Sequence, residues 1–153
     1  MRSLIDIKEL SIPEIDELIS VAKDIIANPA EYVEKCRGKK LATLFYEPST
    51  RTRLSFEAAM YELGGNVLGF SSSDSSSASK GESVADTVKV CSGYADIIAM
   101  RHPKEGAPLV ASMHSLVPIR TSHSGYSFFT VSAIADSTVT LYSGAVRISL
   151  LSQ

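Results

Sequence analysis

The stretch FYEPSTRTRLSFEAAMYELGG, from Phe45 to Gly65, joins the end of an apolar run to the start of a helical one. Between these two segments, hydroxyl and guanidinium groups crowd into consecutive positions: Ser49, Thr50, Arg51, Thr52 and Arg53. So many adjacent polar side chains are not expected in a hydrophobic core. A small anion rich in oxygen atoms, in contrast, accepts hydrogen bonds from such groups. The stretch therefore predicts a binding site for an anion of this kind.

The segments on either side of this stretch alternate between two patterns. Short, nearly continuous apolar runs, typical of strands buried on both faces, occur at Lys40–Tyr46, Asn66–Phe70 and Asp96–Arg101. Apolar residues at helical spacing occur between them, at Arg51–Leu63 and Glu82–Gly93. The alternation predicts an α/β fold, a parallel sheet with crossover helices. Such sheets bind ligands at the carboxyl ends of their strands, which is where the polar stretch lies.

Further helices are expected before and after this core. Ser11–Pro29 has the spacing of an amphipathic helix, and Ser11 with Glu14 forms a capping-box pattern at its start. Residues 29–36 suggest a short second helix. After Arg101, apolar residues return at helical spacing: Leu109, Met113 and Leu116.

The composition changes near Pro118. From Ile119 to Gln153 the chain carries a single acidic residue, Asp136, and many serines and threonines. We therefore divide the chain into a sheet domain at residues 1–118 and an atypical tail at residues 119–153. Strand-like or irregular structure is expected in the tail, which we predict to be mobile.

The bulk composition excludes several classes of partner. With 153 residues, 44% of them hydrophobic, the chain is long enough for one globular domain. A formal net charge of −2 argues against nucleic acid or an anionic membrane as the partner. No apolar run is long enough to cross a bilayer, and the first residues lack the pattern of a signal peptide. Cys36 and Cys91 are isolated, as expected for reduced thiols in a cytoplasmic protein.

Two interpretations of the polar stretch remain open. Ser49 or Thr50 can cap the helix that begins there, and the first backbone N–H groups of that helix would then bind phosphate together with Arg51 and Thr52. The alternative is a capped helix with solvated arginines. One arginine alone would favour the second interpretation, whereas two hydroxyls and Arg51 within one turn favour the first.

The other two predicted strands also end in polar residues. Ser71–Ser83 follows the second strand and is either a flexible linker or a loop that closes over a ligand with Lys80. Arg101 ends the third strand and is expected to be a further anion or carbonyl ligand. His102 is held extended by Pro103, and we interpret it as a structural histidine.

Taken together, the stretches FYEPSTRTRLSFEAAMYELGGNV and KGESVADTVKVCSGYADIIAMRHPKEGAPLVAS resemble the carbamoyl-phosphate-binding domain of the catalytic chain of the aspartate carbamoyltransferases. The resemblance runs from about Leu4 to Pro118. The STRTR turn is shared with the ornithine carbamoyltransferases, but RLSFEAAM and RHPKEGA are similar to the aspartate enzymes.

The resemblance implies a role for each matching residue. Ser49, Thr50, Arg51 and Thr52 would grip the phosphate of carbamoyl phosphate. Thr52 would also reach the carbonyl oxygen, which Arg101 would polarise. Lys80, with Ser76 or Ser77, would enter the active site of a neighbouring subunit in a homotrimer. The reaction would transfer the carbamoyl group to the amine of L-aspartate in pyrimidine biosynthesis, with no metal or cofactor. The implied catalytic residues are Arg51, Thr52, Lys80 and Arg101.

The sequence departs from the family pattern after Pro118. The asparagine- and glycine-rich loop and the His-Pro-Thr-Gln motif of the family do not occur, and His123 in TSHSGY matches neither. The second domain, which binds aspartate, is also not seen. We therefore expect a family domain spliced to an unrelated ending, inactive as an isolated chain, with L-aspartate as a partner only if a second domain is supplied. The alternatives are a natural divergent ending, a non-catalytic phosphate-binding or subunit-interaction module, and a fragment of an ornithine-type enzyme.

Overall fold

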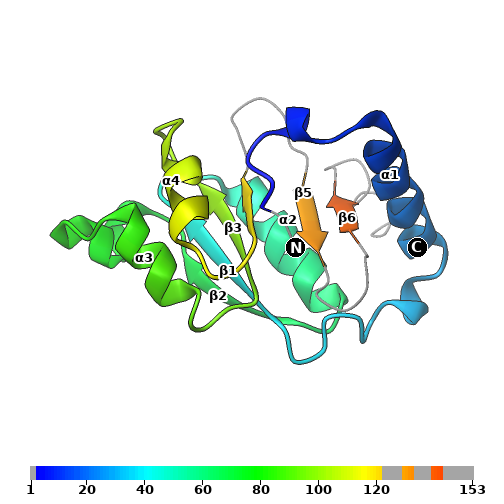
Figure 1. Ribbon diagram of the computed structural model, residues 1–153. Helices are drawn as coiled ribbons and strands as arrows, with labels where there is room; N and C mark the ends of the chain where they lie inside the picture. Colours follow the sequence, from blue (N-terminus) through cyan, green and yellow to red (C-terminus); the bar gives the residue numbers. More distant parts are fainter. Residues whose placement is uncertain (1–2, 122–128, 133–138, 143–153) are drawn as a thin grey trace.

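The computed structural model describes residues 3–121, 129–132 and 139–142, and its centre is a four-stranded parallel sheet (Figure 1). The strands lie in the order β2-β1-β3-β4. Their bounds are Lys40–Phe45 for β1, Asn66–Phe70 for β2, Ile97–Arg101 for β3 and Ile119–Thr121 for β4. The parallel α/β fold predicted from the alternating pattern is confirmed.

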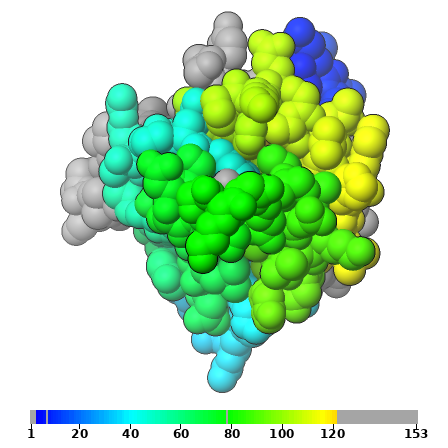
Figure 2. Space-filling model, turned by 90° about the vertical axis from the view of Figure 1, so that its left-hand side faces the viewer, coloured from blue at the N-terminus to red at the C-terminus, as the bar shows by residue number. Residues whose placement is uncertain are grey.

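Strand β1 fixes the register of the sheet because it pairs with β2 on one side and β3 on the other. Leu44 lies opposite Phe70, and Phe45 lies opposite Arg101. The carboxyl ends of the three strands therefore reach one edge of the sheet together. Figure 2 shows this side of the molecule, where the loop after β2 (green) projects beside the segments that follow β1 (cyan) and β3 (yellow-green).

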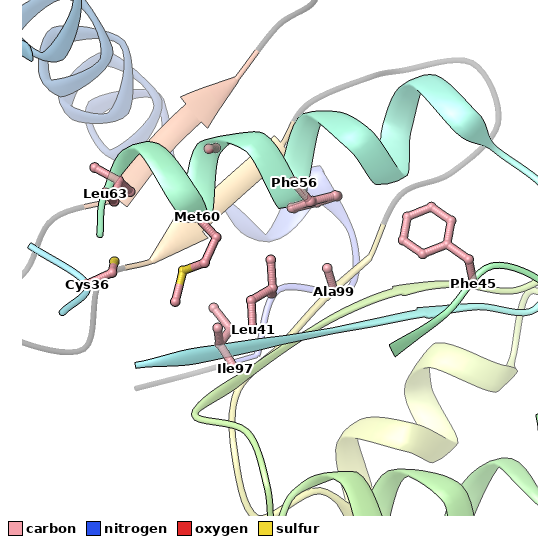
Figure 3. Close-up of a cluster of buried hydrophobic side chains, with 9 residues drawn as sticks. Cys36, Leu41, Phe45, Phe56, Met60, Leu63, Ile97 and Ala99 are labelled. Carbon is pink, nitrogen blue, oxygen red and sulfur yellow. The ribbon is translucent and has the colours of Figure 1, made fainter. Parts of the chain in front are cut away.

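Helix α2 (Thr50–Glu62) covers one face of the sheet (Figure 3). Its apolar side chains pack on alternate residues of β1 and β3, and Phe56 and Met60 are each 1% exposed. This cluster consists of Cys36, Leu41, Phe45, Phe56, Ala59, Met60, Leu63, Ile97 and Ala99.

Helices α3 (Val84–Cys91) and α4 (Ala107–His114) cover the opposite face. The intervening residues of the strands point to this side, as expected from the alternation of side chains along a strand. This second cluster includes Ala42, Leu44, Ile98 and Met100 of the sheet, with Val88 of α3 and Ala111 of α4. The strands are thus buried on both faces, as their continuous apolar runs predicted.

Helix α1 (Ile12–Ala27) begins at the predicted capping box. Ser11 accepts a hydrogen bond from the Glu14 amide, and the Glu14 carboxylate accepts one from the Ser11 amide.

Strands β5 (Phe129–Ser132) and β6 (Val139–Tyr142) pair antiparallel, and their backbone lies between α2 and α1 in Figure 1. Short 3-10 helices lie at Ile7–Glu9, Pro29–Glu31, Ser73–Ser75 and Ser77–Lys80. The one at Pro29 replaces the short second helix suggested by residues 29–36.

The sheet continues past Pro118. Strand β4 pairs with β3, and the Ile119 carbonyl accepts a hydrogen bond of 2.8 Å from the Leu4 amide. The division of the chain at Pro118 stays a prediction. The predicted mobility of the tail falls largely on residues outside the described ranges, as does the environment of His123. No helix within the described ranges is long and apolar enough to span a membrane.

The orientation of α4 differs from what its spacing suggested. Leu109 and Met113 of α4 are 51% and 72% exposed, and Leu116, just after the helix, is 80% exposed, whereas Ala107, Pro108 and Ala111 face the interior. Small residues let a helix approach a neighbouring layer closely, so they take the inner side. Spacing predicted the helix correctly, but the larger side chains lie on its outer face.

The packing of α2 on the sheet makes a prediction for stability. Phe56→Ala should lower the free energy of unfolding by about 3–5 kcal/mol, because it leaves a cavity in the core between α2 and the sheet. Leu54→Ala on the exposed side of the same helix, where Leu54 is 43% exposed, is the matched control. Urea unfolding measures both variants. Equal losses would contradict the described orientation of α2.

Candidate functional site

Helix α2 presents its N-terminus at the carboxyl edge of the sheet. Ser49 occupies the N-cap position, as predicted, and its carbonyl accepts a hydrogen bond of 3.0 Å from the Arg53 amide. The Ser49 hydroxyl, however, makes no capping hydrogen bond to the helix. Thr50 is the first helical residue and so cannot be the cap. The first-turn amides therefore lack a side-chain cap from either predicted residue, an arrangement that suits an external anion.

The two arginines of the STRTR turn have different surroundings. The Arg53 Nε lies 3.7 Å from the Glu57 Oε1, and the same oxygen accepts a hydrogen bond of 3.0 Å from the Thr43 hydroxyl on β1. Arg51 is exposed and forms no ion pair with any residue that the structure describes. Thr52 lies between them and is 6% exposed. Arg53 is thus engaged along its own helix, whereas Arg51 is available at the surface.

Arg101 is tied to the loop that precedes α2. Its Nε donates a hydrogen bond of 2.5 Å to the Glu47 Oε1, and its backbone carbonyl accepts one of 2.9 Å from the Tyr46 amide. Only 16% of the Arg101 side chain is exposed. The structure therefore brings the end of β3 against the loop that carries Ser49. Sequence reasoning missed Glu47, because a single carboxylate before a proline carries no signal of its own.

The ring of Tyr46, which directly follows β1, contacts residues at the ends of β2 and β3. Its ring meets the Phe70 ring edge-on, with centroids 5.0 Å apart, and lies 4.7 Å from the His102 ring. Phe70 ends β2, and His102 directly follows β3. This contact was not foreseen, because an aromatic residue at the end of an apolar run is indistinguishable from any other core residue.

His102 has the surroundings of a structural residue. Its Nδ1 accepts a hydrogen bond of 3.0 Å from the Lys104 amide, which requires that nitrogen to be unprotonated. Burial lowers the pKa of His102 below its ordinary value, and the positive charge of Lys104 lowers it further. A neutral imidazole that orders the loop after β3 agrees with the structural interpretation of this histidine.

The serine-rich loop after β2 has regular local structure. Its hydroxyls bond back to carbonyls three residues earlier, from Ser75 to Ser72, from Ser76 to Ser73 and from Ser79 to Ser76, at 2.8–2.9 Å. Lys80 ends the 3-10 helix Ser77–Lys80. It is exposed and forms no ion pair within the described part of the chain. The loop is thus more ordered than the linker interpretation implied. No described hydrogen bond joins Lys80 to Arg51 or Arg101.

A concave region lies elsewhere, at the opposite edge of the sheet. It borders the residues that precede β3 and β4 and the end of α4, and its lining consists of Ser3, Asp96, Ser112, Ser115, Leu116, Val117 and Pro118. None of the predicted site residues lines it. Within the described ranges, no cluster of three or more His, Cys, Asp or Glu side chains could hold a metal ion.

The fold is an α/β domain in which the N-terminus of α2, with Arg51 in its first turn, and the end of β3, with Arg101, both lie at the carboxyl edge of a parallel sheet. Residues 2–140 match the family model described as the carbamoyl-P binding domain of aspartate/ornithine carbamoyltransferase. The chain belongs to this family.

Similar curated proteins include catalytic subunits of aspartate carbamoyltransferase. The chain is 64% identical over 125 residues to that of Lachnoclostridium phytofermentans, covering 82% of this chain and 41% of the relative. It is 62% identical over 124 residues to that of Clostridium novyi, covering 81% and 40% respectively. The chain thus spans about two fifths of the length of these relatives.

Solved structures of aspartate transcarbamoylases are also similar to this chain. The catalytic subunit of M. jannaschii aspartate transcarbamoylase superposes with a TM-score of 0.74 at 50% identity, covering 82% of this chain and 42% of that one. The aspartate transcarbamoylase of Trypanosoma cruzi, solved in complex with carbamoyl phosphate and aspartate, superposes with a TM-score of 0.73 at 34% identity, covering 78% and 40%.

The surroundings of His102 predict a pH dependence of stability. Because folding lowers the pKa of this residue, the unfolded chain binds a proton more readily than the folded one. The contribution is therefore fully present above about pH 6.5 and is lost as the pH falls through the lowered pKa of the folded state. His102→Gln should flatten the decline of stability between about pH 7.5 and 5, measured by urea unfolding.

His114→Gln is the control, since His114 is exposed at the end of α4. That variant should follow the unaltered chain. If both variants and the unaltered chain lost stability in parallel, His102 would not be the residue responsible.

Proposed function

We propose that this chain is the carbamoyl-phosphate-binding half of an aspartate carbamoyltransferase, the enzyme that transfers a carbamoyl group to L-aspartate in pyrimidine biosynthesis. The observation that carries the proposal is the junction of Arg101 with the loop before α2, through the 2.5 Å contact between Arg101 and Glu47. The family match and the names of the relatives support the choice of substrate.

Carbamoyl phosphate would bind with its phosphate at the N-terminus of α2. Ser49 and Thr50 would donate hydroxyl and amide hydrogen bonds, and Arg51 would add its planar fork of N–H groups. Thr52 would reach the phosphate and the carbonyl oxygen. The exposure of Arg51 and the lack of a capping bond from Ser49 support this assignment, because both leave donors available.

Arg101 would polarise the carbonyl of the carbamoyl group. Glu47 takes the Nε of the guanidinium, so the two terminal nitrogens remain to donate to the substrate. A carboxylate in this position orients the arginine, but its negative charge also opposes that of an incoming anion. Substrate binding would therefore weaken or rearrange the contact between Glu47 and Arg101.

The chemistry would need few groups beyond these. The neutral amine of aspartate attacks the carbamoyl carbon, a tetrahedral oxyanion forms, and phosphate leaves with the electrons of its bond to that carbon and takes up the proton that the amine loses. Arg101 and Thr52 stabilise the oxyanion, and Arg51 and the helix N-terminus stabilise the departing phosphate. Positioning and electrostatic stabilisation supply most of the rate in such a site.

The complete site requires more than these residues. Lys80, with Ser76 or Ser77, would act in the site of a neighbouring subunit of a homotrimer, and the exposure of Lys80 leaves it available for that role. Aspartate would bind only when a second domain is supplied. The 153 residues are therefore proposed to bind carbamoyl phosphate in the cytoplasm without converting it.

A non-catalytic subunit-interaction module is the second candidate. Helices α3 and α4 and the residues that follow them favour it, because they expose apolar side chains: Val90, Tyr94, Leu109, Val110, Met113 and Leu116. Exposed apolar patches of this kind are typical of surfaces that bind other proteins.

Anion binding tests the first candidate. Arg51→Ala should weaken binding of carbamoyl phosphate or inorganic phosphate by roughly 10- to 100-fold, the range expected for a lost hydrogen bond to a charged group. Arg37→Ala removes the same charge from a side chain that is 80% exposed and ion-paired with Glu34, and should bind as the unaltered chain does. Calorimetric titration measures both. Equal weakening in the two variants would mean that net charge, and not a site, governs binding.

Turnover and assembly separate the two candidates. The purified 153-residue chain should form no carbamoyl aspartate from carbamoyl phosphate and L-aspartate, because it spans only 41% of the length of a relative that is a catalytic subunit. Turnover by the chain alone at an ordinary enzymatic rate would refute this. Co-assembly with a full-length catalytic subunit, without any binding of phosphate by the chain itself, would favour the interaction module.

A further inference from the structure

The position of the Arg101 guanidinium depends on both ends of its side chain. At the main-chain end, the Arg101 carbonyl accepts a hydrogen bond of 2.9 Å from the Tyr46 amide, which ties the end of β3 to β1. At the other end, the Nε donates its hydrogen bond of 2.5 Å to Glu47. An arginine side chain has several rotatable bonds, so its guanidinium keeps one position only when both ends are held.

His102 closes the turn that directly follows Arg101. Its Nδ1 accepts the hydrogen bond of 3.0 Å from the amide of Lys104, two residues ahead. Between them, the ring of Pro103 fixes its own φ and keeps the backbone of His102 extended. The hydrogen bond therefore sets the direction in which the chain leaves β3, before α4 begins at Ala107.

The ring of His102 makes a second contact, with the segment that follows β1. Its centroid lies 4.7 Å from that of the Tyr46 ring, and the two planes are inclined by 52°. Tyr46 is 8% exposed and directly precedes Glu47. The contact thus joins the segment that carries Arg101 to the segment that carries its carboxylate partner. A relative movement of these two segments would change the distance between Arg101 and Glu47.

Histidine is the residue type that can make both contacts at once. Phenylalanine would offer a ring without an acceptor, and asparagine would offer an acceptor without a ring. A neutral imidazole has an apolar face and, in the plane of the ring, one nitrogen that accepts and one that donates. Because Nδ1 accepts from Lys104, the proton is on Nε2. The ring therefore adds no positive charge beside the Arg101 guanidinium.

We propose that His102 is a positioning residue, whose Nδ1 fixes the end of β3 so that Arg101 points at the carbonyl of bound carbamoyl phosphate. This inference rests on the proposed function of the site. His102 acts through Arg101 and does not itself contact the ligand. A donor that is held in place before the ligand arrives loses little freedom on binding, so the contribution of His102 appears as affinity.

Two amide substitutions test the position of the acceptor. His102→Asn places a carbonyl oxygen where Nδ1 lies, whereas His102→Gln places it further out, at the position of Nε2. In calorimetric titration, His102→Gln should bind carbamoyl phosphate about 3- to 10-fold more weakly than the unaltered chain, the loss expected for one neutral hydrogen bond. His102→Asn should bind more tightly than His102→Gln. If the asparagine variant binds no better than the glutamine variant, the inference is wrong.

A second substitution, at Arg101, separates positioning from a purely structural role. Arg101→Ala alone should weaken the binding of carbamoyl phosphate. Adding His102→Gln to Arg101→Ala should change the affinity by less than about twofold, because the residue through which His102 acts is then missing. The same loss on adding His102→Gln in the presence and in the absence of Arg101 would show that His102 supports the fold alone.

Control variants account for changes in folding and in histidine content. His114→Gln makes the same chemical change at an exposed histidine at the end of α4, and should leave binding unchanged. Urea unfolding shows whether each variant is folded under the conditions of the titration. His102→Phe keeps a ring against Tyr46 without an acceptor. It replaces the amide variants if loss of the ring unfolds them, and should also bind about 3- to 10-fold more weakly.

The outcomes separate this inference from the proposed function. If the unaltered chain binds no carbamoyl phosphate, the proposed function fails and the inference fails with it. If the unaltered chain binds carbamoyl phosphate and the variants His102→Gln and His102→Phe bind it equally well, the inference alone is wrong. Arg101 would then be positioned by Glu47 and the Tyr46 amide without His102.

Discussion

The parallel pairing of β1 with both of its neighbours is the constraint on which the rest of the structure depends. Because Leu44 lies opposite Phe70 and Phe45 opposite Arg101, the chain leaves all three strands at the same edge. The helix N-terminus at Ser49, the serine-rich loop that carries Lys80 and Arg101 arrive there from distant parts of the sequence. A change of register in either pairing would separate them.

Side-chain contacts at this edge fix the positions of residues that come from different strands and loops. Glu47 orients Arg101 through its Nε, and Glu57 engages Arg53, so that Arg51 is left as the exposed arginine of the turn. Tyr46 packs against the residues on both of its flanks, Phe70 and His102. In the proposed site, these side chains would preorganise the binding groups without touching a ligand themselves. Such supporting residues fix the geometry on which electrostatic stabilisation depends.

The sequence predicted the elements of the fold but not their contacts. Continuous apolar runs and helical spacing are local signals, so they located β1, α2 and the capping box at Ser11 correctly. The partner of Arg101 lies 54 residues away, and only the register of the sheet brings Glu47 to it. The exposed side of α4 was also unpredictable, because spacing identifies an apolar stripe without saying whether small or large residues face inward. The buried hydroxyl of Tyr46 has no signature in the sequence either, because a tyrosine at the end of an apolar run resembles any other core residue.

Nuclear magnetic resonance during a phosphate titration tests the central claim most directly, namely that one anion is held jointly by the α2 N-terminus and the end of β3. The backbone amide signals of Thr50 to Arg53 and the Nε–H signal of Arg101 should shift together, with one common dissociation constant. Shifts confined to the helix, or two unrelated dissociation constants, would show that these groups belong to separate surfaces and would contradict the account.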